Sequence, residues 1–250
     1  MAEHKFPTEV IDLPSQGKLY SKDSPLAEGK IELKYMTTRE EDILMSENLI
    51  KKGVVIDKLL DSLIVTPNVK QTDLILGDKN AVLVAARILA YGPQYTTKIN
   101  NPKDQNQQIE HTLDLSQCPF KEISGDVKHD GNSFDFRTPI GKTNIKFKIL
   151  TGGDEALINK DIEQSKKYGV ETSISTRLRY SVIEVDGDKK QETINSFTQN
   201  MLARDSVALR NEILRVSPDI DMTSEVEIGG EAVSVSIPLS VEFFWPSSIE

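Results

Sequence analysis

The sequence predicts an α+β protein, with a helical body, a small inserted antiparallel β unit and a C-terminal β-hairpin. Three observations predict it. Apolar residues recur at helical spacing between residues 40 and 91, and the spacing changes to two within 95–150. Near the C-terminus, two alternating runs flank a Gly-Gly pair, which is typical of a hairpin. No internal repeat is visible, so one composite fold is expected.

The chain divides into four segments. Residues 1–28 carry prolines and little apolar periodicity, which predicts an extended N-terminal arm. Residues 29–94 form a strand plus a helical body, and residues 95–150 form the inserted antiparallel β unit. Residues 151–250 supply helices, a strand and the C-terminal hairpin that complete the body.

The helical body opens with clean alternation over 30–35, which predicts a strand with one buried face. Two amphipathic helices follow and end near Gly53 and Pro67. Asp78 is a suitable N-cap for a third helix over 79–91, which is apolar almost all round. This third helix is therefore expected at the centre of the body.

The remaining segments carry turn signals between alternating and helical patterns. The polar residues 96–108 predict a loop tip, and Asp130-Gly131 predicts a hairpin turn. A helix is expected over 154–168, an alternating strand over 170–185 and one long helix over 191–215.

The charge balance limits the possible partners. The 250 residues include 30 Lys plus Arg against 39 Asp plus Glu, a net charge of −9. Nucleic-acid surfaces need clustered basic residues, so this acidic balance argues against such a partner. No apolar run approaches the ~20 residues of a membrane-spanning helix, and the N-terminus lacks the apolar core of a secretory signal. We expect a soluble protein of a reducing cytosol.

Few residues could carry chemistry. The single cysteine, Cys118, allows no internal disulfide and no cysteine-built zinc site. Cys118 and His111 both fall in the β unit, where a half-buried thiol and a strand-face histidine are expected. A catalytic cysteine–histidine pair stays open as an alternative, because such residues are adjacent in the fold rather than in the sequence. Gly141-Lys142-Thr143 resembles the end of a phosphate-binding loop. That motif also requires a glycine five residues earlier, where this chain has Phe136, so a hairpin turn is favoured. No catalytic, metal or cofactor residue is predicted.

Two features suggest contacts with other proteins. Phe243-Phe244-Trp245 would make a terminal strand apolar on both faces, which is either central in a sheet or covered by a partner. Arg204 and Arg210 on the long helix form either a subunit interface or a surface ion-pair network.

Seven short phrases occur in a fixed order over nearly the whole chain. They are Leu13-Pro14-Ser15 with Gly17 and Tyr20; Met36-Thr37-Thr38-Arg39-Glu40-Glu41; Ile56-Asp57-Lys58-Leu59-Leu60; Gly77-Asp78-Lys79-Asn80; Arg87 with Tyr91-Gly92 and Tyr95; Ala203-Arg204-Asp205; and Phe243-Phe244-Trp245-Pro246. In this order they resemble the baseplate hub protein family of T-even-type contractile-tailed bacteriophages. Relatives often place a cysteine pair after the Tyr-Gly-x-x-Tyr stretch; Asn100–Asp104 has none, so no metal site is expected here.

The resemblance implies a non-enzymatic protein of the virion tail, assembled in the host cytoplasm and bound to other baseplate or tail proteins, namely hub or tape-measure components. Self-association stays open, as does a transient assembly chaperone that is absent from the finished particle; an enzyme with an unrecognised site is the third alternative. The expected contact residues are Leu13, Pro14, Tyr20, Arg204, Arg210, Phe244 and Trp245. Arg39 and Arg87 rank second, and a buried carboxylate partner is favoured for Arg87.

Overall fold

The computed structural model describes residues 6–101, 104–169, 172–228 and 231–245. Within these ranges the fold is α+β, as the sequence predicts, with eight α-helices and five small antiparallel sheets. The α-helices are α1 (Thr38–Leu44), α2 (Glu47–Lys51), α3 (Val55–Leu63), α4 (Leu76–Tyr91), α5 (Gly152–Lys167), α6 (Ser173–Ser181), α7 (Gln191–Asn200) and α8 (Ala203–Val216). Short 3₁₀ turns are η1 (Pro25–Glu28), η2 (Gln71–Asp73), η3 (Leu115–Gln117) and η4 (Val241–Phe244).

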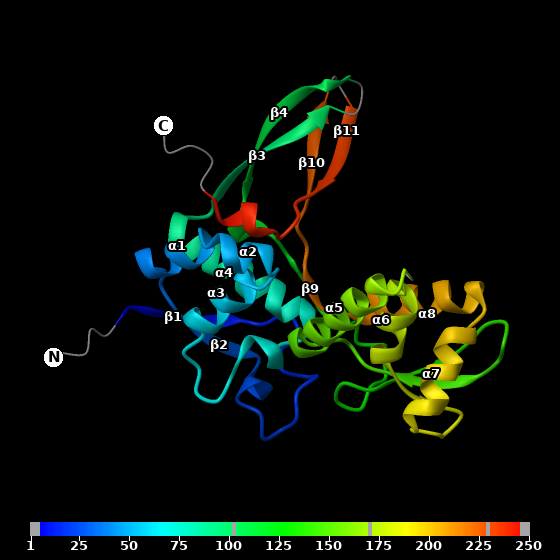
Figure 1. Ribbon diagram of the computed structural model, residues 1–250. Coiled ribbons are helices and arrows are strands. Elements are labelled where there is room, and N and C mark those ends of the chain that lie inside the picture. The colour runs from blue at the N-terminus through cyan, green and yellow to red at the C-terminus, as the bar shows by residue number, and fades with distance from the viewer. Residues whose placement is uncertain (1–5, 102–103, 170–171, 229–230, 246–250) are drawn as a thin grey trace.

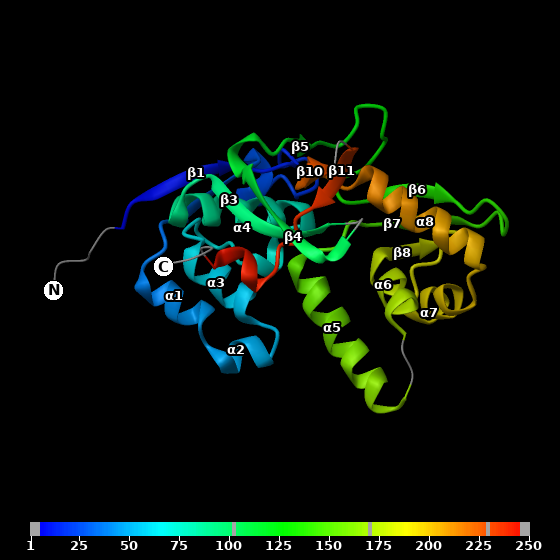
Figure 2. The same cartoon turned by 90° about the horizontal axis from the view of Figure 1, so that it is seen from above.

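Helices α1–α4 gather at one end of the molecule and α5–α8 at the other, as both views show (Figure 1, Figure 2). The strands are β1 (Thr8–Asp12), β2 (Lys30–Lys34), β3 (Gln94–Asn101), β4 (Asp104–Asp114), β5 (Phe120–Lys121), β6 (Phe134–Arg137), β7 (Asn144–Phe147), β8 (Val182–Val185), β9 (Asp219–Ile220), β10 (Thr223–Ile228) and β11 (Glu231–Ser236). Each end has its own hydrophobic cluster, one built on α3 and α4 and one on β6–β8 with α6–α8.

The described part of the N-terminal arm is bound to the body. β1 pairs antiparallel with β2, from Thr8 opposite Lys34 to Asp12 opposite Lys30. Beyond β1 the chain turns back, and Leu13, Leu19 and Leu26 are buried. Although the segment has few apolar residues, these three belong to the hydrophobic core.

Helix α4 is central and mostly buried, as its apolar sequence predicts. It begins at Leu76 rather than 79, because Leu76 N–H donates to the carbonyl of Leu150 and the chain turns into the helix there. Asp78 therefore lies in the first turn and is not the N-cap. At Gly77 an added Cβ would lie 1.8 Å from the carbonyl oxygen of Pro218, so only glycine permits this contact between distant segments.

Residues 95–150 contribute to three sheets. β3 and β4 form a long hairpin, β5 pairs with β9, and β6 and β7 share a three-stranded sheet with β8. The two sheets with partners beyond 180 tie this segment to the C-terminal half of the chain.

Two predictions between residues 172 and 215 are wrong. Residues 173–181 are the helix α6 rather than a strand, because their buried residues Thr176, Leu178 and Ser181 face α5, α7 and β8 from a helix. The long helix is two helices, since Met201 and Leu202 adopt extended backbone angles between α7 and α8.

The C-terminal hairpin forms as predicted, with β10 antiparallel to β11. The strand expected after it is instead the 3₁₀ turn η4, in which Phe243 and Phe244 are both buried. Ring centroids of Tyr95 and Phe243 lie 5.0 Å apart, so η4 packs against the start of β3. The two long hairpins stand side by side and project from the body (Figure 1).

Candidate interaction surfaces

The phrase at Leu13–Tyr20 and the phrase at Gly77–Asn80 meet at one buried carboxylate. Asp78 accepts hydrogen bonds from Ser15 N at 2.9 Å, Ser15 Oγ at 2.6 Å and the Tyr20 hydroxyl at 2.7 Å. The Tyr20 hydroxyl also accepts from Ile75 N at 3.1 Å. Burial raises the pKa of Asp78, although the Ser15 and Tyr20 hydrogen bonds act in the opposite direction. These phrases fasten the N-terminal segment to α4.

A second buried carboxylate lies in the phrase at Met36–Glu41. Glu40 accepts from Lys34 Nζ at 2.8 Å, from Ser62 Oγ at 2.6 Å, and from Thr37 through its N–H at 2.9 Å and its Oγ1 at 2.7 Å. Burial alone would raise its pKa, but these hydrogen bonds outweigh it and lower the pKa of Glu40 to about 2. Glu40 therefore joins β2, α1 and α3 as an ionised carboxylate.

Arg87 joins α4 to the C-terminal phrase. Its Nε donates to the carbonyl of Phe243 at 3.2 Å, and its guanidinium carbon lies 4.7 Å from the Tyr91 ring centroid and 5.8 Å from that of Tyr95. The expected carboxylate partner is not found among the described residues, and its buried Nη1 has no hydrogen-bond partner there. Burial lowers the pKa of this guanidinium.

Asp205, in the phrase at Ala203–Asp205, binds the segment that resembles a phosphate loop. Its carboxylate accepts from Ile140 N at 2.8 Å and Gly141 N at 2.9 Å. Lys142 in the same segment has a φ of 56°, as a tight turn between β6 and β7 requires. The backbone donors that a phosphate would need are therefore already occupied.

Four of the seven expected contact residues lie inside the fold. Leu13, Pro14 and Phe244 are buried, and the Tyr20 hydroxyl is taken by Asp78. The described contacts of these four residues are internal, because the arm and the tail close on α4, and their contact with a partner stays a prediction. Arg204 and Arg210 are exposed, as is second-ranked Arg39, and Trp245 is 46 % exposed.

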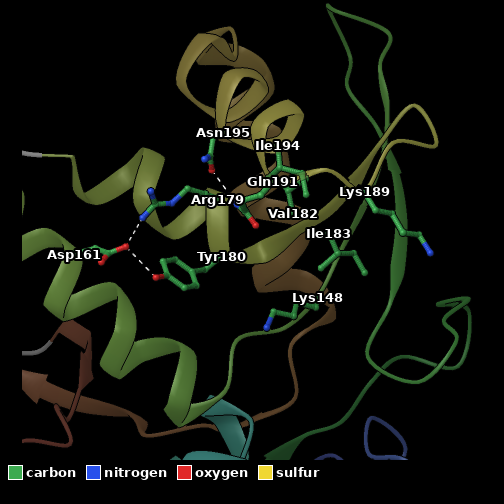
Figure 3. Close-up of a pocket in the computed structure, with 10 residues that line it drawn as sticks. All are labelled: Lys148, Asp161, Arg179, Tyr180, Val182, Ile183, Lys189, Gln191, Ile194 and Asn195. Carbon is green, nitrogen blue, oxygen red and sulfur yellow. Dashed lines mark hydrogen bonds and ion pairs between the residues drawn. The ribbon is translucent and has the colours of Figure 1, made fainter.

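One hollow of about 460 Å³ lies between α5, α6, β8 and α7 (Figure 3). Asp161 points into it and accepts from Arg179 and from the Tyr180 hydroxyl at 2.9 Å. Burial raises the pKa of Tyr180, which keeps the phenol protonated at neutral pH. Lys148 is paired with Asp154 at 2.8 Å. Asp161, Arg179 and Tyr180 thus bind one another in this hollow, whereas Lys148 pairs with a residue outside its lining.

A more apolar groove of about 430 Å³ runs between α6 and α8. Ile174 and Leu214 at its rim are 53 % and 67 % exposed, whereas Leu178 at its base is buried. Arg210 lines this groove, which brings one predicted contact residue to an apolar surface. Ile174 was missed because its segment was predicted as a strand; the spacing of Val207, Arg210 and Leu214 along α8 was the available signal.

The paired hairpins form another surface. His111 Nε2 and Ser224 Oγ lie 2.9 Å apart and join β4 to β10. In β10 and β11, buried or half-buried Val226, Val233 and Val235 alternate with exposed residues. His111 thus contacts the second hairpin, while the thiol of Cys118 is half-buried and its pKa is raised by burial.

No group of three or more His, Cys, Asp or Glu side chains in the described ranges is placed to hold a metal ion. No helix of the described chain combines the length and apolar character needed to cross a bilayer.

Comparison with known proteins gives one match. The model of the family described as T4 bacteriophage base plate protein matches residues 6–245. No curated protein and no solved structure matches the chain. The matched range contains all seven phrases except the terminal Pro246, and the buried contacts of Asp78, Glu40, Arg87 and Asp205 all lie within it. Because the match covers nearly the whole chain, this protein belongs to the T4-type bacteriophage baseplate protein family.

Proposed function

We propose that this baseplate protein is a structural subunit of the central hub region, that it acts through contacts with other baseplate or tail proteins, and that it catalyses no reaction. The observation that carries the proposal is the pair of projecting hairpins, β3–β4 and β10–β11. Assembly would take place in the host cytoplasm, before the tail is complete.

The hairpins are suited to protein contact because each is a separate two-stranded sheet in the described structure. Two-stranded ribbons are marginally stable alone in water. Here the ribbons support each other through contacts such as His111 with Ser224, and each strand still has an edge without a ladder partner in the described residues. Such edges can accept an additional strand from a neighbouring protein.

The test of the role is quantitative mass spectrometry of salt-washed phage particles. A hub subunit is expected at a small whole-number ratio to known baseplate proteins. Absence from particles, with abundance in the infected-cell lysate, would overturn the structural role and favour a transient assembly chaperone.

A shortened hairpin tests the contact itself. Thr96 and Thr112 are opposite each other in the ladder, so an Asn-Gly pair can replace residues 97–111 as a two-residue turn. We expect this variant to fold, with the helical part of its far-ultraviolet spectrum retained and the strand part reduced, and to lower particle yield at least tenfold. Normal yield would show that the projecting part of this hairpin contacts nothing essential.

A further inference from the structure

We infer that the groove between α6 and α8 binds an amphipathic helix of another baseplate protein, with apolar side chains in the groove and a carboxylate on Arg210. The inference rests on the proposed function, since it names the chemistry of one partner. It depends on a surface separate from the projecting hairpins.

The groove exposes apolar surface where a folded chain would ordinarily bury it. Ile174 on α6 and Leu214 on α8 are both more than half exposed, and Ile213, Leu178 and Leu150 line the groove beneath them. A second exposed apolar residue of α8, Val207, lies two turns before Leu214 on the same side of the helix. Rows of this kind mark interaction sites more often than single exposed residues do.

The charge on α8 indicates the sign of the partner. The guanidinium of Arg210 donates only to the carbonyl of Ser206, at 3.4 Å, and has no carboxylate partner in the described chain. Two neighbouring arginines are paired, Arg177 with Glu155 and Arg215 with Glu212 at 2.8 Å, whereas Arg204 on α8 has no ion pair in the described chain. Of the two arginines that line the groove, Arg210 is the one without a carboxylate partner in the described chain. It favours a carboxylate on the partner, because bidentate pairing to carboxylates is the geometry that arginine provides.

The shape favours a helix as the occupant. A groove between two helices accepts the side-chain ridge of a third, and an amphipathic helix enters such a groove through residues spaced i, i+3, i+4 and i+7. The α8 side of the groove offers Arg210 and Leu214, four residues apart and therefore on one face of the helix, to such an incoming row. A second copy of this chain is disfavoured, since a two-fold contact through this stripe would bring Arg210 near its own copy.

Photo-cross-linking tests the occupant. The full chain, with a benzophenone amino acid in place of Leu214, is expressed during infection, and the cross-linked peptide is sequenced. We expect a peptide of another baseplate protein with apolar residues three and four apart and an Asp or Glu beside them. A basic peptide, a peptide of this chain or no cross-link would each overturn the inference.

Charge reversal tests the carboxylate. Arg210→Glu is expected to weaken binding to the partner so identified at least tenfold, and a lysine in place of the partner's carboxylate is expected to restore it. Arg137→Glu is the matched control, because Arg137 on β6 is exposed, has no ion pair in the described structure and, like Arg210, donates its Nε to a backbone carbonyl. Weakening by both variants, or no rescue, would contradict the specific pair.

An apolar pair of variants completes the design. Leu214→Ser is expected to weaken binding at least tenfold, whereas Met45→Ser, at 66 % exposure beside α1, is expected to leave it unchanged. The two proposals fail separately. If the chain is present in particles at whole-number stoichiometry but forms no cross-link at position 214, the structural role stands and the groove inference fails. If the chain is absent from particles, the structural role fails.

Discussion

The two hydrophobic clusters are stabilised by different contacts. The cluster around α3 and α4 lies among three buried charged residues, Glu40, Asp78 and Arg87, whose partners are as distant as the 156 residues between Arg87 and Phe243. The cluster around β6–β8 has one buried charged residue beside it, Asp205, and otherwise buried hydroxyls such as Thr198. The first end of the molecule therefore depends on specific polar partners, and the second depends mainly on apolar packing.

This difference indicates which residues are expected to carry a family resemblance. A buried carboxylate tolerates few changes in its surroundings, because each donor left without an acceptor costs ~1–3 kcal/mol. The phrases Leu13-Pro14-Ser15 and Gly77-Asp78, which carry the resemblance to the family, contain such a carboxylate and one of its donors. Apolar surfaces tolerate exchange among similar side chains, so a docking groove leaves a weaker trace in the sequence.

The largest expected effect is loss of the Asp78 carboxylate. Asp78→Ala leaves Ser15 N, Ser15 Oγ and the Tyr20 hydroxyl without their acceptor. We expect the free energy of unfolding to fall by about 4 kcal/mol, measured by urea denaturation. The control Asp23→Ala removes an exposed carboxylate and should change stability by less than ~0.5 kcal/mol. Equal effects would show that the buried network contributes nothing special.

Acid should act on the first cluster through Glu40. Its pKa is lowered from 4.5 to about 2, so its contribution is complete above pH 4.5 and is lost as the pH falls through 2. That contribution is about 3 kcal/mol. Glu40→Gln should be less stable at pH 7, and the difference from wild type should shrink between pH 4.5 and 2. A difference that stays constant across urea titrations at these pH values would refute this.

Asp205→Ala is expected to have a smaller effect, about 2 kcal/mol, because water can reach the half-exposed turn at Ile140 and Gly141 that loses its acceptor. Hydrogen exchange should rise at these two amides, and helix α4 should keep its protection. Faster exchange throughout α4 would show that the two clusters are not stabilised independently.

The smallest expected effect is at Arg87. Arg87→Met loses the hydrogen bond to Phe243 but also removes a buried cation that has no carboxylate partner. Since these effects oppose each other, the free energy of unfolding should change by less than ~1 kcal/mol. Near-ultraviolet circular dichroism should still report a packed Tyr95 and Phe243. A loss as large as that of Asp78→Ala would mean that the guanidinium is as strongly stabilising as the carboxylate.

Apolar spacing and turn residues predicted those elements whose structure is set by neighbouring residues in the sequence. The central helix α4, strand β2 and the hairpin β10–β11 follow from apolar spacing and turn residues. Residues 173–181 were misread because a short segment with Leu178 and Ile174 four apart fits a strand face and a helix face equally well. The helix break at Met201 could not be predicted, because no proline or glycine lies there.

The interaction surfaces were harder to predict than the fold. Arg210 was named from its residue type and lies at the groove, whereas Phe244 was named from its apolar neighbours and is core. The distinction depends on η4 returning to α4, which is a contact between residues 156 apart and leaves no periodicity in the sequence. Without it, an apolar tail and an apolar core segment look alike.

The return of η4 to α4 also sets a time for folding during synthesis. The first cluster includes Ile220, Met222, Ile237, Phe243 and Phe244. Its residues from the first half of the chain therefore pack fully only after residues 220–244 have been synthesised. While the end of the chain is still inside the ribosome, Arg87 has no Phe243 carbonyl to bind and the face of α4 that η4 will cover stays open. Packing of the first cluster is therefore complete only after residue 244 has left the ribosome.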